Sequence, residues 1–237
     1  MPTLAEQAAS LFQLTLTPQQ AAQFDSYAAQ LAEWNERVNL TAIVAPEAVQ
    51  LRHFLDSLSV VRAIQPFTGM RVVDVGTGAG FPGLPLKIAF PDTVLTLMEA
   101  TGKKITFLNH IIQSLGLKHT TTLHARAEEA GQMRGQRAAY DLVVARSVAR
   151  LPALLEYMLP LARVGGMCVA MKGETAAEET ADSRRALTLL GGKLVDIITV
   201  QLPGLDAPHY LIRVEKIAPT PSAYPRKPGT PTRQPLV

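Results

Sequence analysis

Cysteine, aromatic side chains and long apolar runs are all scarce in this sequence of 237 residues. Its single cysteine, Cys168, excludes an intrachain disulfide and any zinc site built from several cysteines. No apolar run reaches the ~20 residues of a membrane-spanning helix, and residues 1–10 lack the basic-then-apolar layout of a signal peptide. We therefore expect a protein of the reducing cytoplasm with neither a membrane nor a metal as partner.

Acidic residues are missing from the end of the chain. Residues 216–237 contain no Asp or Glu but four cations, namely Lys216, Arg226, Lys227 and Arg233. Because the net charge of the whole chain is +3, the remaining residues sum to about −1. The positive charge is thus concentrated where it could meet a polyanion, although a solvated tail that keeps the protein soluble would look the same.

The most informative segment that is present covers residues 71–83. A short apolar strand ends there in Asp74, and the glycines that follow are Gly76, Gly78, Gly80 and Gly83. The dinucleotide fingerprint G-x-G-x-x-G would need a glycine at position 81, which is Phe81. An acid two residues before the first glycine would repel a pyrophosphate but suits an ammonium or sulfonium group. The segment predicts S-adenosylmethionine as the ligand, with a merely tight strand-to-helix turn as the alternative.

Apolar spacing divides the rest of the chain into two kinds of structure. Residues 17–39 begin with a capping box and continue at helical spacing, and a second helix is expected from residue 46. Residues 1–65 are therefore expected to form an N-terminal helical extension that packs on the next part.

From residue 70, strands alternate with helices. Strands are expected over residues 72–75, 94–98, 121–124, 142–145 and 167–171, helices over 84–89, 103–115 and 151–161, and a closing antiparallel hairpin over 194–201 and 210–214. This alternation predicts an α/β domain over residues 66–217, with a mostly parallel, seven-stranded sheet covered on both faces. Six prolines in residues 219–235 predict an extended, poorly ordered, basic tail over 218–237.

Ligands of such a sheet bind beyond the carboxyl ends of its strands, and this rule selects candidate residues. Glu99 follows the second strand, 25 residues after Asp74, where a carboxylate could accept hydrogen bonds from both ribose hydroxyls. After the third strand, the backbone at Ala127 or the side chain of Glu128 could accept the adenine amino group. Phe81 either packs against the cofactor or fills the core.

Cations end the next two strands. Arg146 and Lys172 face the same crevice, where they could bind a carboxylate or a phosphate. Lys103 and Lys104 begin a helix, which opposes the helix dipole and indicates an external anion, unless they are simply solvated. His53 lies in an apolar segment, which is typical of a packing residue.

Two familiar methyltransferase motifs are missing: a Pro-Cys nucleophile and an Asn-Pro-Pro-aromatic tetrapeptide. A ring nitrogen such as N7 of guanine presents a free lone pair, so it needs alignment and no base. We therefore expect Arg146 and Lys172 to position the substrate, with no general base.

Together these segments resemble the bacterial RsmG family, also called glucose-inhibited division protein B (GidB). The matching segments are residues 34–41, 53–57, 74–86, 126–128, 145–149, 170–173 and 224–229, which span nearly the whole chain. The resemblance implies a Rossmann-like class I fold and methyl transfer from S-adenosylmethionine to N7 of a guanosine in 16S ribosomal RNA. The target would lie in a loop near the decoding centre, and S-adenosylhomocysteine would be the product.

The resemblance also implies a set of contacts. Cofactor contacts are expected at Gly76, Phe81, Glu99, Ala100, Thr101, Ala127, Glu128 and Arg146, although relatives often carry Asp at the position of Glu99. From the placement of the cations themselves, we expect RNA contacts at Lys103, Lys104, Arg146, Lys172, Arg226 and Lys227. The expected partner is 16S rRNA or the small ribosomal subunit, with no DNA, and the enzyme is expected to be a monomer. A small-molecule methyltransferase and a non-catalytic, cofactor-sensing module that binds the ribosome remain as alternatives.

Overall fold

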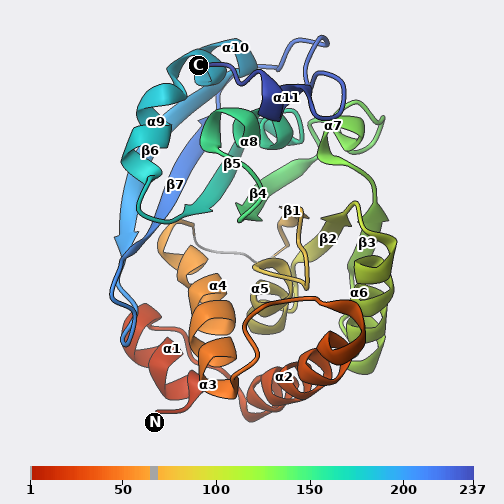
Figure 1. The fold of residues 1–237 in the computed structure, drawn as a ribbon, viewed down its shortest axis with the longest axis vertical. Helices are drawn as coiled ribbons and strands as arrows, with labels where there is room; N and C mark the ends of the chain where they lie inside the picture. The colour runs from red at the N-terminus through yellow and green to blue at the C-terminus, as the bar shows by residue number, and fades with distance from the viewer. Residues whose placement is uncertain (1, 65–68) are drawn as a thin grey trace.

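A central sheet separates two layers of helices in the computed structural model, which describes residues 2–64 and 69–237 (Figure 1). The N-terminal helices lie on one side of the sheet, and the C-terminal segment, residues 218–237, lies on the other. The buried residues form two hydrophobic clusters, one under each helical layer. The expected boundary between residues 65 and 66 lies outside the described residues.

The sheet has seven strands in the order β3-β2-β1-β4-β5-β7-β6. Their bounds are β1 (Arg71–Val75), β2 (Val94–Glu99), β3 (Thr120–His124), β4 (Tyr140–Arg146), β5 (Ala162–Lys172), β6 (Gly192–Val200) and β7 (His209–Lys216). The first five pair in parallel, whereas β7 is antiparallel to both of its neighbours. This confirms the predicted sheet, and strand order reverses where β1 pairs with both β2 and β4.

One helical layer is formed by the N-terminal helices together with α5 (Gly83–Ala89) and α6 (Gly102–Ser114). It begins with α1 (Leu4–Phe12), which the sequence analysis did not predict, and continues with α2 (Pro18–Val38), whose capping box at Thr17 was predicted. A further helical run follows: α3 (Pro46–Val49), the π-helix η1 (Gln50–Leu55), α4 (Asp56–Leu58) and the 3₁₀-helix η2 (Ser59–Arg62). A π-turn inside a helix is frequent at functional sites, and this one carries His53 just before Asp56.

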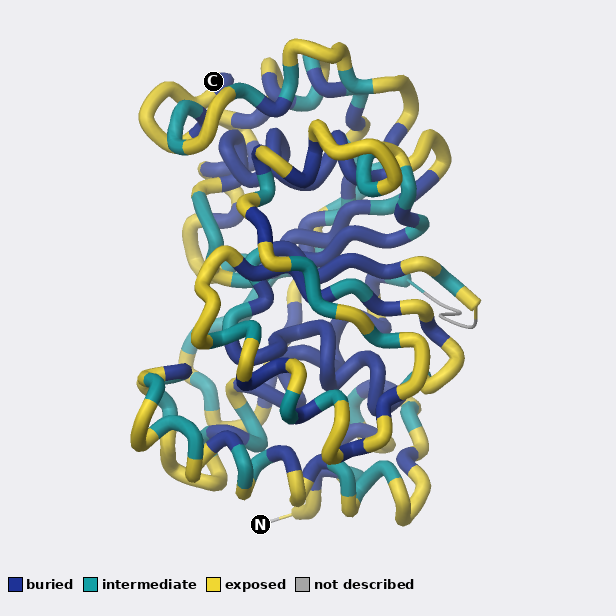
Figure 2. The backbone as a smooth tube through the Cα atoms, turned by 90° about the vertical axis from the view of Figure 1, so that its right-hand side faces the viewer, coloured by how far each residue is buried: buried dark blue, intermediate teal, exposed yellow. Residues whose placement is uncertain are grey.

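The opposite layer contains α7 (Ala127–Ala130), α8 (Leu151–Met158), α9 (Ala176–Asp182), α10 (Arg184–Leu190) and α11 (Thr230–Arg233). Of these, α8 was predicted as a helix, and α7, α9, α10 and α11 were not. Every residue of α8 is buried, since this helix lies between the sheet and the C-terminal segment. Figure 2 shows the same arrangement as a band of buried strands with exposed loops around it.

The prediction of a poorly ordered tail is wrong. Arg226 makes a two-pronged ion pair with Glu156 of α8, with its Nη2 2.7 Å from Oε2 and its Nε 2.9 Å from Oε1, and Glu156 is fully buried. Pro225 packs so closely that a Cβ on Gly131 would lie 2.5 Å from its ring. The tail is anchored because α8 offers it a buried charge, which proline content alone does not reveal.

Candidate active site

Asp74 shapes the turn between β1 and α5. Its Oδ2 accepts hydrogen bonds from the backbone N–H of Gly83 at 2.7 Å and from Oγ1 of Thr77 at 2.6 Å. Its Oδ1 is buried and has no hydrogen-bond partner in the described part of the chain. Burial raises the pKa of Asp74 to about 6, against the opposing effect of those two hydrogen bonds. The turn therefore holds a buried carboxylate with one unused acceptor.

The glycines of this turn differ in what surrounds them. A Cβ on Gly80 would lie 2.3 Å from Cδ1 of Leu84, and one on Gly83 would lie 2.8 Å from Oδ2 of Asp74, so both positions are closed by packing. Gly78 has a φ of +62°, and a Cβ there would meet nothing within 4 Å. Gly78 thus borders open space at the carboxyl edge of the sheet, where a ligand can approach its backbone.

Glu99 ends β2 beside this turn, as its spacing from Asp74 predicted. Its Oε2 accepts the backbone N–H of Gly78 at 3.1 Å, and its Oε1 accepts that of Thr101 at 2.9 Å. Lys104 lies 4.0 Å from the same carboxylate. Ala100 and Thr101 are exposed next to it. One carboxylate therefore joins the glycine turn to the start of α6.

The end of β3 leads into α7, where the adenine contacts were predicted. Glu128 is buried, and its Oε1 accepts a hydrogen bond of 2.9 Å from the backbone N–H of Gly229 in the C-terminal segment. Ala127 is half-buried. Because a carboxylate can accept more than this one hydrogen bond, Glu128 and the backbone at Ala127 both remain candidates for the adenine contact.

The side chain of Phe81 fills the core. It is 5% exposed, and its ring lies 4.3 Å from that of His53 and 5.5 Å from that of Tyr27, measured between centroids. The guanidinium carbon of Arg146 lies 5.1 Å from the same centroid, which is a cation–π distance. Phe81 therefore connects the N-terminal helices to the end of β4.

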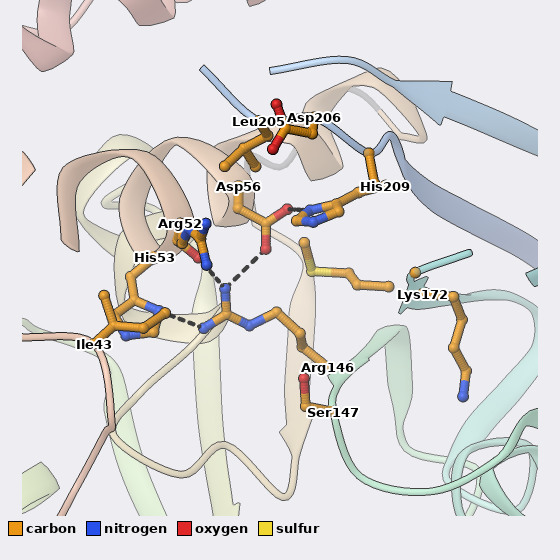
Figure 3. Close-up of a pocket in the computed structure, with 13 residues that line it drawn as sticks. Ile43, Arg52, His53, Asp56, Arg146, Ser147, Lys172, Leu205, Asp206 and His209 are labelled. Carbon is orange, nitrogen blue, oxygen red and sulfur yellow. Dashed lines mark hydrogen bonds and ion pairs between the residues drawn. The ribbon is translucent and has the colours of Figure 1, made fainter. Parts of the chain in front are cut away.

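Arg146 lies where the sequence places it, at the carboxyl end of β4, but its guanidinium is already paired. Nη1 donates to Oδ2 of Asp56 and to the carbonyl of Arg52, both at 2.8 Å, and Nη2 donates to Nδ1 of His53 at 3.1 Å (Figure 3). All three partners belong to the helical run of residues 46–62. Arg146 thus ties the N-terminal extension to the sheet.

Two members of this cluster, Asp56 and His209, were missed by sequence reasoning. Oδ1 of Asp56 accepts from Nδ1 of His209 at 2.7 Å, so the carboxylate lies between His209 and Arg146 (Figure 3). Although burial raises the pKa of Asp56, hydrogen bonds from His209 and Arg146 outweigh that effect and hold it below its usual value. A weak signal existed, because Asp56 follows His53 by three residues and so shares its helix face.

His53 is neutral, in keeping with its predicted packing role. Burial and the nearby Arg146 charge lower its pKa to about 4. Because its Nδ1 accepts from Arg146, the ring proton is on Nε2, which donates to Oγ1 of Thr41 at 2.9 Å. Both ring nitrogens are therefore occupied.

The remaining predicted cations fall into two groups. Lys172 points away from Arg146 (Figure 3). It donates to the carbonyl of Ala149 and lies 2.7 Å from Oε2 of Glu179. Arg226 is bound to Glu156, as described above. By contrast, Lys103 and Lys227 are exposed, and Lys104 is half-exposed near Glu99.

A cavity of about 540 Å³ lies beside Arg146. The helical run contributes Arg52, His53 and Asp56 to its wall, β4 and β5 contribute Arg146 and Lys172, and the start of β7 contributes His209. Its volume lies within the range of small-ligand sites. Within residues 2–64 and 69–237, no group of three or more His, Cys, Asp or Glu side chains could hold a metal ion. No described helix is both long and apolar enough to cross a membrane.

Solved structures with the same fold define the class of protein. A SAM-dependent methyltransferase from Aquifex aeolicus matches 73% of this chain and 94% of its own, with a TM-score of 0.54 and 16% identity. TrmN from Thermus thermophilus matches 68% of this chain and 48% of its own, with a TM-score of 0.53 and 19% identity. The strand order is that of the class I S-adenosylmethionine-dependent methyltransferase fold.

Sequence relatives define the family. Residues 20–205 match the family described as GidB, rRNA small subunit methyltransferase G. The ribosomal RNA small subunit methyltransferase G of Alkaliphilus metalliredigens is 47% identical over 92% of this chain and 91% of its own, and that of Acetivibrio thermocellus is 46% identical over 96% and 93%. The chain belongs to this family, and its cofactor is S-adenosylmethionine.

The residues of the glycine turn fit that cofactor. Gly78 leaves its backbone open to a ligand, and Glu99 stands beside it with the carboxylate that a ribose requires. The unused buried acceptor on Asp74 is compatible with a cationic ligand group nearby. Asp74, Gly76, Gly78, Gly80, Glu99, Ala100, Thr101 and Ala127 surround this edge of the sheet.

Proposed function

We propose that this enzyme methylates N7 of a guanosine in 16S ribosomal RNA, in the loop near the decoding centre that the family resemblance implies. One observation supports the choice of N7: the buried titratable groups of the cavity beside Arg146 are already hydrogen-bonded. Asp56 accepts from Arg146 and His209, and both ring nitrogens of His53 are bound. His209, the remaining histidine of the described cavity wall, keeps Nε2 free, but its hydrogen bond to Asp56 raises its pKa and so favours the protonated ring, which cannot act as a base. The cavity therefore favours a nucleophile that has a lone pair and no proton to lose.

The residues of the glycine turn and of the cavity then have distinct roles. S-adenosylmethionine supplies an electrophilic methyl group on its sulfonium sulfur. Glu99 and the backbone around Gly78 hold the donor at the edge of β1 and β2, while Arg146 and its partners form the wall against which the base is aligned. Alignment at near-attack distance supplies most of the rate when no proton transfer accompanies the step.

RNA phosphates would be bound by exposed cations. Lys103, Lys104 and Lys227 can meet this need, whereas Lys172 and Arg226 are paired inside the molecule with Glu179 and Glu156. We further propose that the enzyme acts in the cytoplasm as a monomer, on 16S rRNA or the small subunit and not on DNA.

The test is methyl transfer from labelled S-adenosylmethionine to small-subunit rRNA that lacks the modification, followed by nucleoside analysis. Label in 7-methylguanosine supports the proposal, and label on an exocyclic amine or a ribose refutes it. Arg146→Ala should reduce the rate by at least about 100-fold, because it removes a charge and leaves Asp56 without one partner. Arg163→Ala is the matched control, since Arg163 pairs with Asp141 on the surface.

A further inference from the structure

The cavity beside Arg146 has one polar wall that remains open to a ligand. His209 opens β7, and its side chain is about one-third exposed into this space. Its Nδ1 donates to the buried Asp56, which fixes the tautomer because an ionised carboxylate can only accept. In the described part of the chain, that is the one hydrogen bond of the ring. Nε2 of His209 is therefore left for whatever occupies the cavity.

The charge on His209 decides what Nε2 can do. The hydrogen bond to Asp56 raises the pKa of His209 above 6.5, against the opposing effects of burial and of the Arg146 and Arg52 charges. The other charged groups near its wall are Asp206 in the preceding loop and Lys172 on β5, which is paired with Glu179. When the ring is protonated, Nε2 is a donor; when it is neutral, Nε2 is an acceptor.

A hydrogen-bond donor at the position of Nε2 distinguishes guanine from adenine. Guanine carries the acceptor O6 next to N7, whereas adenine carries an amino group there. A hydrogen bond to O6 leaves the lone pair of N7 free for the methyl group. His53 cannot take this role, because its Nδ1 and Nε2 are both bound. Nη1 of Arg146 already donates to two oxygens of the helical run, the carbonyl of Arg52 and Oδ2 of Asp56.

We infer that His209, oriented by Asp56, donates a hydrogen bond from Nε2 to O6 of the target guanine and so determines the enzyme's choice of guanine over adenine. This inference rests on the proposed N7 reaction. Asp56 acts through His209 as a positioning residue, and His209 itself touches the base.

The experiment compares three RNA substrates that carry guanosine, inosine or 2-aminopurine riboside at the target position. All three keep N7, but only 2-aminopurine lacks O6. The wild-type enzyme should accept inosine and should lose about 10-fold or more in kcat/KM on 2-aminopurine. His209→Ala should reduce kcat/KM on guanosine to the level of 2-aminopurine, so that the preference disappears.

His209→Gln is the decisive second variant, because an amide donates at every pH. The variant should keep the preference for substrates that carry O6. The kcat/KM of the wild type should fall as pH rises through the raised pKa of His209, and the kcat/KM of the variant should not. His110→Gln is the matched control, since His110 lies against Trp34 and does not line the cavity. Cofactor affinity and melting temperature, measured for each variant, identify a fold defect.

Equal losses on guanosine and 2-aminopurine RNA in His209→Ala would overturn the inference while leaving the proposed function intact. An alkaline fall that persists in His209→Gln would do the same. Label on an atom other than N7 in the wild-type reaction would overturn the proposed function, and this inference with it.

Discussion

At the scale of single residues, Asp74 makes the stability of the folded protein depend on pH. Its pKa is raised from 3.8 to about 6 by burial, so between these pH values the folded protein binds a proton that the unfolded chain releases. The contribution of this group to stability is therefore largest below pH 4 and is lost as pH rises through about 6.

Asp74→Asn removes that titration. The free energy of unfolding of the variant, relative to wild type, should rise by about 1–3 kcal/mol between pH 4 and pH 7.5. Urea titrations of both proteins at several pH values measure the difference. A constant difference across this range would contradict the raised pKa. Because the variant also loses a negative charge beside the cofactor edge, its affinity for S-adenosylmethionine should fall.

Glu99 offers a second test at this scale. Glu99→Ala leaves the N–H groups of Gly78 and Thr101 without their acceptor and removes the carboxylate expected at the ribose. The dissociation constant for S-adenosylmethionine, measured by calorimetry, should rise at least about 10-fold. Glu47→Ala, at an exposed glutamate of α3, should leave it unchanged. Equal affinities for wild type and Glu99→Ala would remove Glu99 from the cofactor site.

At the scale of elements, the C-terminal segment and α8 depend on one another. Arg226→Ala leaves the buried carboxylate of Glu156 without its counter-charge, although the backbone N–H of residue 226 still donates to it, at a cost of about 3 kcal/mol in the free energy of unfolding. Adding Glu156→Gln removes the charge and should restore a large part of that loss. Denaturant unfolding of the two single variants and the double variant measures the coupling. Strict additivity would mean that the pair contributes nothing.

Individual elements also show what the sequence could and could not predict. The β-strands and the glycine turn were predictable because short apolar runs and an acid-led run of glycines are local signals. The π-turn, α9 and α10 were not predictable, because these short helical segments are stabilised by packing and carry no long apolar periodicity. The C-terminal segment was misjudged because the partner of Arg226 lies 70 residues earlier. In the same way, Asp56 and His209 are 153 residues apart and meet only in the folded chain.

At the scale of the whole molecule, the N-terminal helices and the sheet share one hydrophobic core. Gln20 donates from Nε2 to the carbonyl groups of Ile88 and Ala89, and Tyr27 donates to that of Ala79. Trp34 on α2 lies against Phe107 and His110 of α6. Residues 2–64 are thus part of a single packed body and not a separable appendage.

Trp34 makes this testable, because it is the single tryptophan of the chain. Its fluorescence follows the N-terminal helices, whereas far-ultraviolet circular dichroism follows every helix. The two signals should report the same urea midpoint, as expected for one cooperative transition. A fluorescence change that precedes the loss of dichroism would show that the N-terminal helices detach first.

The anchored C-terminal segment also has a consequence for how the protein is made. Glu156 leaves the ribosome 70 residues before Arg226 does, so the nascent chain carries this carboxylate without its counter-charge until residue 226 has been made. During that interval α8 cannot reach its fully buried position without leaving the carboxylate uncompensated, so we expect this side chain to stay hydrated. Packing of α8 is thereby delayed until residue 226 has emerged.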